Sequence, residues 1–123
     1  MSAAGPHVLV VEDDTNVIDA YRIVFESAGH RFSAAGSVDD AVRICTEERP
    51  DVMFLDLRLR HEDGLDVLLT LARRGAAAPP VYALTGDADP DLLARCRAAG
   101  VRDVLLKPVP WRDLVRHATD AIA

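Results

Sequence analysis

Short apolar runs alternate with helix-like stretches along the chain. Each run is rich in β-branched or other apolar side chains, and each precedes a segment whose apolar residues recur every three or four positions. The runs are Val8–Val11, Arg31–Ala34, Val52–Leu55, Val81–Leu84 and Asp103–Leu106. The pattern predicts five strands that alternate with five helices. The second run is the least apolar, which favours an edge position for it.

The helix-like stretches carry apolar faces and end signals. Ser37 and Asp89 are expected N-caps, and Gly29 and Gly100 are expected to end helices. The residues expected to face inward are, helix by helix, Val17, Tyr21, Val24 and Ala28; Ala41, Ile44 and Cys45; Leu65, Leu68, Leu69 and Ala72; Leu92, Leu93 and Cys96; and Trp111, Leu114, Val115, Ala118 and Ile122. We expect Trp111 to pack the last helix against the sheet.

Regular alternation of strands and helices predicts an α/β fold with a parallel sheet, helices on both faces and right-handed crossovers. The third run is apolar throughout, so we expect it to be covered on both faces. The 123 residues fit one domain. We expect a disordered tail over residues 1–6 and a single domain over 7–123.

Composition and charge exclude several functions. The chain is 50% apolar and 28% charged, as soluble globular domains are, and its net charge of -6 argues against direct binding to nucleic acid. No apolar run is long enough to cross a membrane, and the first residues lack a signal-peptide pattern, so we expect a cytoplasmic protein. The two cysteines, Cys45 and Cys96, and the four histidines lack metal-ligand spacing.

Polar residues follow four of the five predicted strands. The acids Glu12-Asp13-Asp14 follow the first strand, Asp56 the third, Thr85 the fourth and Lys107 the fifth. The carboxyl ends of parallel strands lie at one edge of the sheet, where ligand sites form. We therefore expect these side chains to meet in one pocket.

Carboxylates held close together repel one another, and a hard dication relieves that repulsion. Oxygen donors without cysteine or histidine favour Mg²⁺, with Mn²⁺ as an alternative. Asp14 is expected only to cap the first helix. Asp56 ends an apolar strand and is the candidate covalent acceptor of a phosphoryl group. The cation, Lys107 and the Thr85 hydroxyl would neutralise the phosphoryl oxygens.

Four segments carry a family resemblance: Val8-Leu-Val-Val-Glu-Asp-Asp14, Phe54-Leu-Asp-Leu57, Ala83-Leu-Thr-Gly86 and Leu105-Leu-Lys-Pro108. With them in this order, the chain resembles the response-regulator receiver (CheY-like) domain of two-component and phosphorelay systems from about residue 7 to its C-terminus. The resemblance implies a flavodoxin-like, doubly wound (βα)5 fold whose five-stranded parallel sheet has the order 2-1-3-4-5.

The resemblance also implies roles for individual residues. Asp56 would be the phosphoacceptor, and Thr85 and Lys107 would be the switch hydroxyl and the lysine of the site. The implied Mg²⁺ ligands are Asp13 directly, Glu12 largely through water, Asp56, and the backbone carbonyl of Arg58. The phosphoryl donor would be a phosphohistidine on a sensor histidine kinase or on a phosphotransfer protein.

The chain departs from the family pattern at three places. Val104 replaces the aromatic residue usual three positions before the lysine, so ring-mediated coupling is missing. Arg60 replaces a usual proline. Arg58 and Asp87 occupy the variable positions beside the phosphoryl group, and our hypothesis is that they pair across the pocket and modulate entry of the hydrolytic water.

The resemblance implies that the chain is a regulatory phosphoacceptor that catalyses only its own phosphorylation and dephosphorylation. Output would pass to a downstream protein through the face of the fourth helix, fifth strand and fifth helix, with homodimer formation as a further option. The chain would be either a stand-alone receiver or the receiver segment of a hybrid sensor kinase.

Other classes of function make different demands on the sequence. A degenerate receiver or a purely structural module would bind proteins without phosphorylation. A phosphatase with an aspartyl-phosphate intermediate generally needs a cap insertion, whereas the loops after these strands look short. A flavin carrier needs a phosphate loop after the first strand, where Glu12-Asp13-Asp14 would repel a phosphate.

Overall fold

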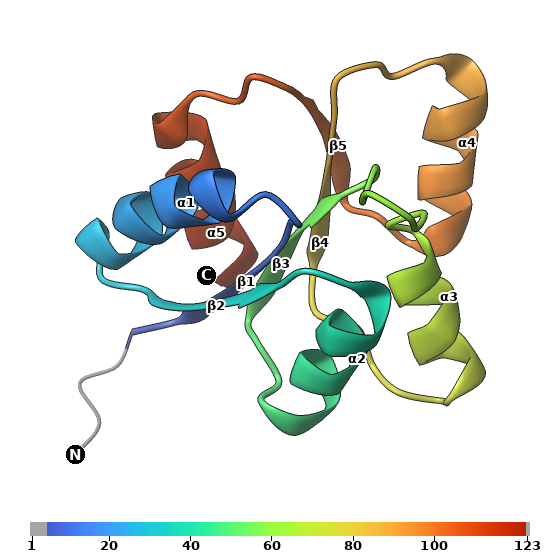
Figure 1. The fold of residues 1–123 in the computed structure, drawn as a ribbon, viewed down its shortest axis with the longest axis horizontal. Helices are drawn as coiled ribbons and strands as arrows, with labels where there is room; N and C mark the ends of the chain where they lie inside the picture. The colour runs from blue at the N-terminus through green and yellow to red at the C-terminus, as the bar shows by residue number, and fades with distance from the viewer. Residues whose placement is uncertain (1–4, 123) are drawn as a thin grey trace.

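The structure, a computed structural model, describes residues 5–122, and within this range five parallel strands form one sheet flanked by helices (Figure 1). The strands are β1 (His7–Val11), β2 (Arg31–Ala35), β3 (Val52–Asp56), β4 (Val81–Thr85) and β5 (Asp103–Leu106). The helices are α1 (Thr15–Ser27), α2 (Val38–Glu47), α3 (Asp66–Arg73), α4 (Pro90–Ala99) and α5 (Trp111–Ile122). The strand order is β2-β1-β3-β4-β5, which confirms the predicted fold and the edge position of β2.

The sheet separates two apolar cores. On one face, α1 and α5 cover an aromatic cluster that includes Phe25, Phe54 and Tyr82. On the other face, α2, α3 and α4 cover the aliphatic side chains of β1, β3 and β4. β3 is buried along its whole length, as its unbroken apolar sequence predicts. Its last residue, Asp56, is therefore held in a fixed position.

The predicted helix signals are confirmed. Asp14 Oδ1 accepts a hydrogen bond from Asn16 N at 2.9 Å and caps α1, as expected for this residue. Ser37 caps α2, and Asp89, followed by proline, caps α4. Gly100 ends α4 with a φ of 88°, a left-handed conformation that glycine adopts without steric cost.

The prediction for the buried face of α3 is partly wrong. Leu69 is 45% exposed and Ala72 is exposed, while Val67, Leu68 and Leu71 are buried. The helix begins at Asp66, so Leu65 is buried from the preceding loop and does not set the helical register. The face that packs on the sheet is therefore rotated from the one expected.

Tyr21 on α1 and Leu114 on α5 pack in the core as expected, but one end of each helix differs from the prediction. In α1 the buried side chain is Phe25, and Ala28 is exposed because the helix ends at Ser27. Trp111 is 56% exposed, so it does not pack α5 against the sheet. It is the first residue of α5, whose buried contacts begin at Leu114, and its ring lies instead beside the guanidinium of Arg112.

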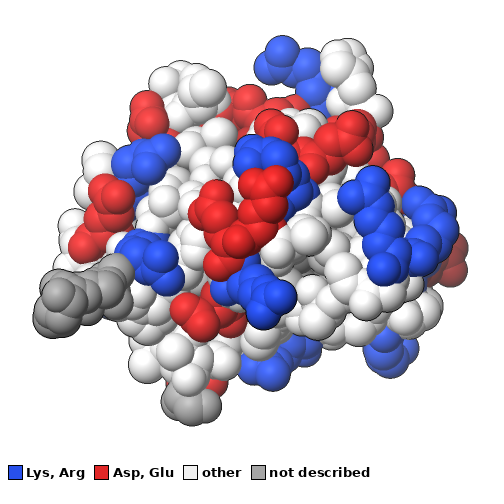
Figure 2. Space-filling view, turned by 90° about the horizontal axis from the view of Figure 1, so that it is seen from below, with Lys and Arg blue, Asp and Glu red and all other residues white. Residues whose placement is uncertain are grey.

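The N-terminal segment, the surface charge and the character of the helices each add one observation. Residues 1–4 of the expected tail lie outside the described range, and Pro6 O accepts a hydrogen bond from Arg31 N at 2.9 Å. On the face drawn in Figure 2, basic and acidic side chains are intermixed. Across residues 5–122, no helix combines the length and the apolar character needed to span a bilayer.

Candidate functional site

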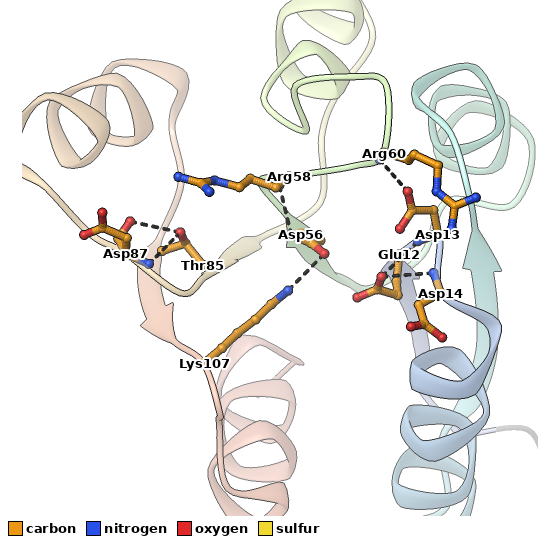
Figure 3. Close-up of polar contacts among 9 residues, drawn as sticks. All are labelled: Glu12, Asp13, Asp14, Asp56, Arg58, Arg60, Thr85, Asp87 and Lys107. Carbon is orange, nitrogen blue, oxygen red and sulfur yellow. Dashed lines mark hydrogen bonds and ion pairs between the residues drawn. The ribbon is translucent and has the colours of Figure 1, made fainter.

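The carboxyl edge of the sheet holds buried polar side chains. Glu12, Asp56 and Thr85 are each at most 4% exposed, and they follow or end β1, β3 and β4. Lys107 follows β5, and Figure 3 shows its ammonium directed at Asp56. Buried ionisable groups are rare unless they are paired or functional. This edge is therefore the candidate site, as the order of the polar residues predicts.

Both carboxylate oxygens of Asp56 have a donor. Lys107 Nζ lies 3.0 Å from Oδ2, and Arg58 N donates to Oδ1 at 2.9 Å. Asp56 and Lys107 lie 51 residues apart in the sequence and meet because β3 and β5 flank β4 in the sheet. The ammonium and the amide keep the buried carboxylate oriented and partly neutralised.

The loop between β3 and α3 lies directly against the end of β3. A Cβ atom on Gly64 would stand 2.1 Å from the carbonyl oxygen of Asp56, so only glycine allows this approach. Gly64 N also donates to Leu57 O at 3.1 Å. Gly64 thus fixes the loop that carries Arg58 beside the candidate phosphoacceptor.

Glu12 is a buried carboxyl beside Asp56. Its Oε2 accepts hydrogen bonds from Asp13 N and Asp14 N, both at 3.1 Å. Burial is the main cause that raises the pKa of Glu12; the neighbouring Asp56 raises it further, while the Asp14 amide and Lys107 oppose the shift. Burial together with the charges of Glu12 and Asp56 likewise raises the pKa of Tyr21. The pocket therefore has an excess of negative charge.

Asp13 has a partner outside the pocket. Its Oδ2 accepts a hydrogen bond from the backbone N–H of Arg60, and Figure 3 shows the carboxylate turned toward that amide. A proline at position 60 has no N–H and would leave this oxygen without the bond. With arginine in place of the family's usual proline at position 60, a hydrogen bond joins the β3–α3 loop to the acidic segment after β1.

The Thr85 hydroxyl is engaged within its own loop. It donates to Asp87 O at 3.0 Å and accepts from Asp87 N at 3.2 Å, and no hydrogen bond joins it to Asp56 among the described residues. Lys107 N donates to Thr85 O at 2.8 Å, which ties the two strand ends together. Arg58 reaches toward this side of the pocket, but it forms no ion pair with Asp87 within residues 5–122 (Figure 3).

The donor set fits a hard dication. Two buried carboxyls, Glu12 and Asp56, neighbour each other; burial is the main cause that raises the pKa of Glu12, and repulsion from Asp56 raises it further. A divalent cation with oxygen ligands would remove that repulsion. Asp13 and the Arg58 carbonyl are the further donors that the sequence suggests. Within residues 5–122, no three His, Cys, Asp or Glu side chains are clustered tightly enough to hold a metal as they stand.

Some contacts of the site have no signal in the sequence. Asp63, in the β3–α3 loop, forms an ion pair with Arg95 on α4. Tyr21 was expected only as a packing residue of the first helix, yet its pKa responds to the site carboxylates. Val104 is half-buried and packs against the core beneath α2, α3 and α4. No local pattern in the sequence marks the Asp63–Arg95 ion pair, the effect of the site on Tyr21 or the packing of Val104.

A doubly wound parallel sheet with a buried aspartate held by a lysine at its carboxyl edge defines the receiver class of signalling domains. Residues 8–119 match the family model of the response regulator receiver domain. The chain belongs to this family, whose members are the receivers of response regulators in two-component systems.

Several characterised proteins are similar over nearly the whole chain. The transcriptional regulatory protein KdpE of Mycobacterium tuberculosis is 35% identical over 115 residues, covering 94% of this chain and 50% of its own length. AfsQ1 of Streptomyces coelicolor, also a transcriptional regulatory protein, is 31% identical over 109 residues, covering 89% of this chain and 48% of its own. The sensor histidine kinase AruS of Pseudomonas aeruginosa is 31% identical over 118 residues, covering 94% of this chain and 12% of its own. The chain thus spans half or less of each of these relatives.

Solved structures share the fold. The signal receiver domain of a putative Luxo repressor protein from Vibrio parahaemolyticus is 25% identical, with a TM-score of 0.85 over 95% of this chain and 89% of that one. The chemotaxis protein CheY4 of Vibrio cholerae is 20% identical, with a TM-score of 0.86 over 96% and 99%. The CheY-like fold predicted from the four sequence segments is confirmed.

Proposed function

We propose that Asp56 accepts a phosphoryl group from a phosphohistidine in a Mg²⁺-dependent reaction, and that the product changes the chain's protein–protein contacts. The observation that carries the proposal is the buried Asp56 carboxylate at the end of β3, with Lys107 Nζ 3.0 Å from its Oδ2. The donor would be a sensor histidine kinase or a histidine phosphotransfer protein, the partners that response regulators use.

The proposed transfer needs positioning more than covalent help from other groups. A carboxylate oxygen of Asp56 attacks phosphorus as the bond from phosphorus to the donor imidazole breaks, and the imidazole keeps the electron pair and takes up a proton. Lys107 pairs with a phosphoryl oxygen, and the Arg58 amide, 2.9 Å from Oδ1, holds the carboxylate in place. The short distances from Lys107 Nζ and Arg58 N to one carboxylate support Asp56 as the single acceptor.

The metal would be held by Asp13, Glu12 (largely through water), Asp56 and the Arg58 carbonyl. Bound there, Mg²⁺ or Mn²⁺ supplies positive charge for the phosphoryl oxygens. The buried carboxyl of Glu12, whose pKa burial raises, supports this use because it has an unfavourable environment for its charge.

Phosphorylation would add roughly -1.5 to -2 charges beside Lys107. The Thr85 hydroxyl would then leave Asp87 for a phosphoryl oxygen and pull the β4–α4 loop with it. The face formed by α4, β5 and α5 would change its contacts with a downstream protein or a second copy of the chain. Leu106 on β5 and Trp111 on α5, 58% and 56% exposed, are apolar anchors available for such a partner.

Incubation with acetyl phosphate and Mg²⁺ tests the proposal. The parent should gain the mass of one phosphoryl group, and Asp56→Asn should not. Asp120→Asn, the same change at an exposed position of α5, is the matched control and should be modified like the parent. Labelling that persists in Asp56→Asn, or that is unaffected by EDTA, would contradict the proposed site or its metal dependence.

Two further experiments address donor and lifetime. Phosphotransfer from a panel of sensor kinases and phosphotransfer proteins should identify a donor, whereas a degenerate receiver would accept from none and still bind its partner. We further propose that Arg58 and Asp87 modulate the hydrolytic water. Arg58→Ala should then change the decay rate of the acyl phosphate, and an unchanged rate would remove this role.

A further inference from the structure

The helix α4 is held to the rest of the fold by few contacts. All ten of its residues are described, and Cys96 alone is buried, whereas α2 of the same length buries five side chains. Leu92 and Ala99 add partly buried contacts to the same core. Apolar burial supplies most of the energy that docks a helix, so the position of α4 is only weakly fixed by its core contacts.

A charged contact restrains α4 from the side of the β3–α3 loop. The guanidinium of Arg95 pairs with Asp63 Oδ2, while Asp63 Oδ1 accepts from Leu65 N at 3.0 Å. One aspartate thus orients the entry to α3 and binds α4. In Figure 1, α3 and α4 lie next to each other at the same side of the sheet.

The same loop is bonded to the candidate phosphoacceptor. Arg58 and Asp63 form an isolated antiparallel bridge, and Arg58 N donates to Asp56 Oδ1 at 2.9 Å. Gly64 lies against the Asp56 carbonyl. A continuous series of contacts therefore runs from Asp56 through Arg58 and Asp63 to Arg95.

The other end of α4 is connected to Thr85. The Thr85 hydroxyl is bonded to Asp87, and Asp89 caps the helix through Leu92 N at 2.8 Å. An open cleft of about 740 Å³ lies between the β3–α3 loop and the start of α4, lined in part by Arg58, Thr85 and Arg95. The start of α4 therefore has space into which it can shift, and both residues of the ion pair, Asp63 and Arg95, line that cleft.

We propose that the Asp63–Arg95 ion pair is a conformational tether that couples Asp56 to α4 and favours the arrangement in which the Thr85 hydroxyl is turned to Asp87. The inference rests on the proposed function, because it concerns how a phosphoryl group on Asp56 is communicated. Val104 provides no aromatic ring for that purpose. The tether is built from the loop and α4 instead, and a change at Asp56 must loosen it for α4 to shift.

The tether makes a measurable difference to ligand binding at Asp56. If the ion pair opposes the shift of α4, removing it lets the phosphorylated-like arrangement form at lower cost. The pair is exposed to solvent, with side chains 54% and 39% accessible, and such pairs contribute little energy. The apparent affinity for beryllofluoride with Mg²⁺ should therefore rise by only about two- to fivefold in Arg95→Gln or Asp63→Asn.

The experiment compares those two variants, their double variant and Arg97→Gln. Asparagine at position 63 keeps an oxygen for Leu65 N, and Arg97 lies on the same helix without an ion pair among the described residues. NMR titration with beryllofluoride should show tighter binding in both single variants, no further gain in the double variant, and parental affinity in Arg97→Gln. Unchanged or weaker binding in Arg95→Gln, or an equal gain in Arg97→Gln, would overturn the tether.

Amide hydrogen exchange gives an independent readout without any ligand. Exchange in α4 should be faster in Arg95→Gln than in the parent and in Arg97→Gln. Equal rates in α4 would also overturn the proposal. A parent that does not respond to beryllofluoride would instead remove the proposed function, and the exchange rates would still decide whether Asp63 restrains α4.

Discussion

Replacing Lys107 by methionine should destabilise the metal-free protein through the carboxylate that it leaves behind. Asp56 is 4% exposed and lies beside Glu12, and the substitution removes the cation 3.0 Å from its carboxylate. Methionine retains the length of the apolar stem, so the change isolates the ammonium. The effect should be seen in urea unfolding at pH 7 in EDTA, since a bound dication would replace the lost charge.

The geometry sets the size of the effect. At 3.0 Å and an effective dielectric constant of about 20, the attraction between the two charges is about 5 kcal/mol before solvation is counted. Desolvation offsets much of it, and the Lys107 side chain is 35% exposed, which screens it further. We expect a net loss of about 1–3 kcal/mol, a shift of about 1 M in the urea midpoint.

A double-mutant cycle with Asp56→Asn separates the ion pair from other effects of the substitution. In the Asp56→Asn background the carboxylate that Lys107 contacts is absent, so Lys107→Met should cost less there than in the parent. Arg97→Met, which removes an exposed cation, should change stability by about 0.5 kcal/mol at most. Equal costs of Lys107→Met in both backgrounds would refute the reasoning.

Three other predictions concern single residues. Gly64→Ala should lower the free energy of unfolding by about 1–3 kcal/mol and slow acetyl phosphate labelling, because its Cβ would stand 2.1 Å from the Asp56 carbonyl oxygen. Urea unfolding and mass spectrometry check this, and parental values in both would contradict it. Burial and Asp56 raise the pKa of Glu12 above 4.5, so in EDTA its protonation favours the folded state at low pH, and this contribution is lost as the pH rises through the raised pKa. The free energy of unfolding of Glu12→Gln, minus that of the parent, should therefore be larger at pH 7 than at pH 4.5. A difference that does not change with pH would count against the raised pKa of Glu12. Burial raises the pKa of the Cys45 thiol to about 11, so alkylation at pH 8 should be slow in the native state and fast in urea; fast native labelling would contradict the burial.

The strands and the chemical groups of the site follow from the sequence pattern, whereas the strand order came from the family resemblance of four sequence segments. Apolar runs such as Val52–Leu55 can be recognised in the sequence because a strand that is buried on both faces needs apolar side chains throughout. Residues that follow the carboxyl ends of the strands share one edge in any parallel sheet. Caps such as Asp14 and Asp89 depend on neighbours within three residues, so local sequence specifies them. The sequence by itself therefore determined the fold class and placed Asp56 and Lys107 at one edge.

The tertiary structure decided the details that depend on distant segments. The rotation of α3, which exposes Leu69, depends on where the preceding loop ends and on how the helix meets the sheet. The partners of Thr85 and Asp13 are backbone groups whose positions follow from loop geometry. The Asp63–Arg95 pair joins residues 32 positions apart on exposed surfaces, where no periodic burial pattern records the contact. Such contacts are set by packing between elements, and hydrophobic periodicity carries no information about them.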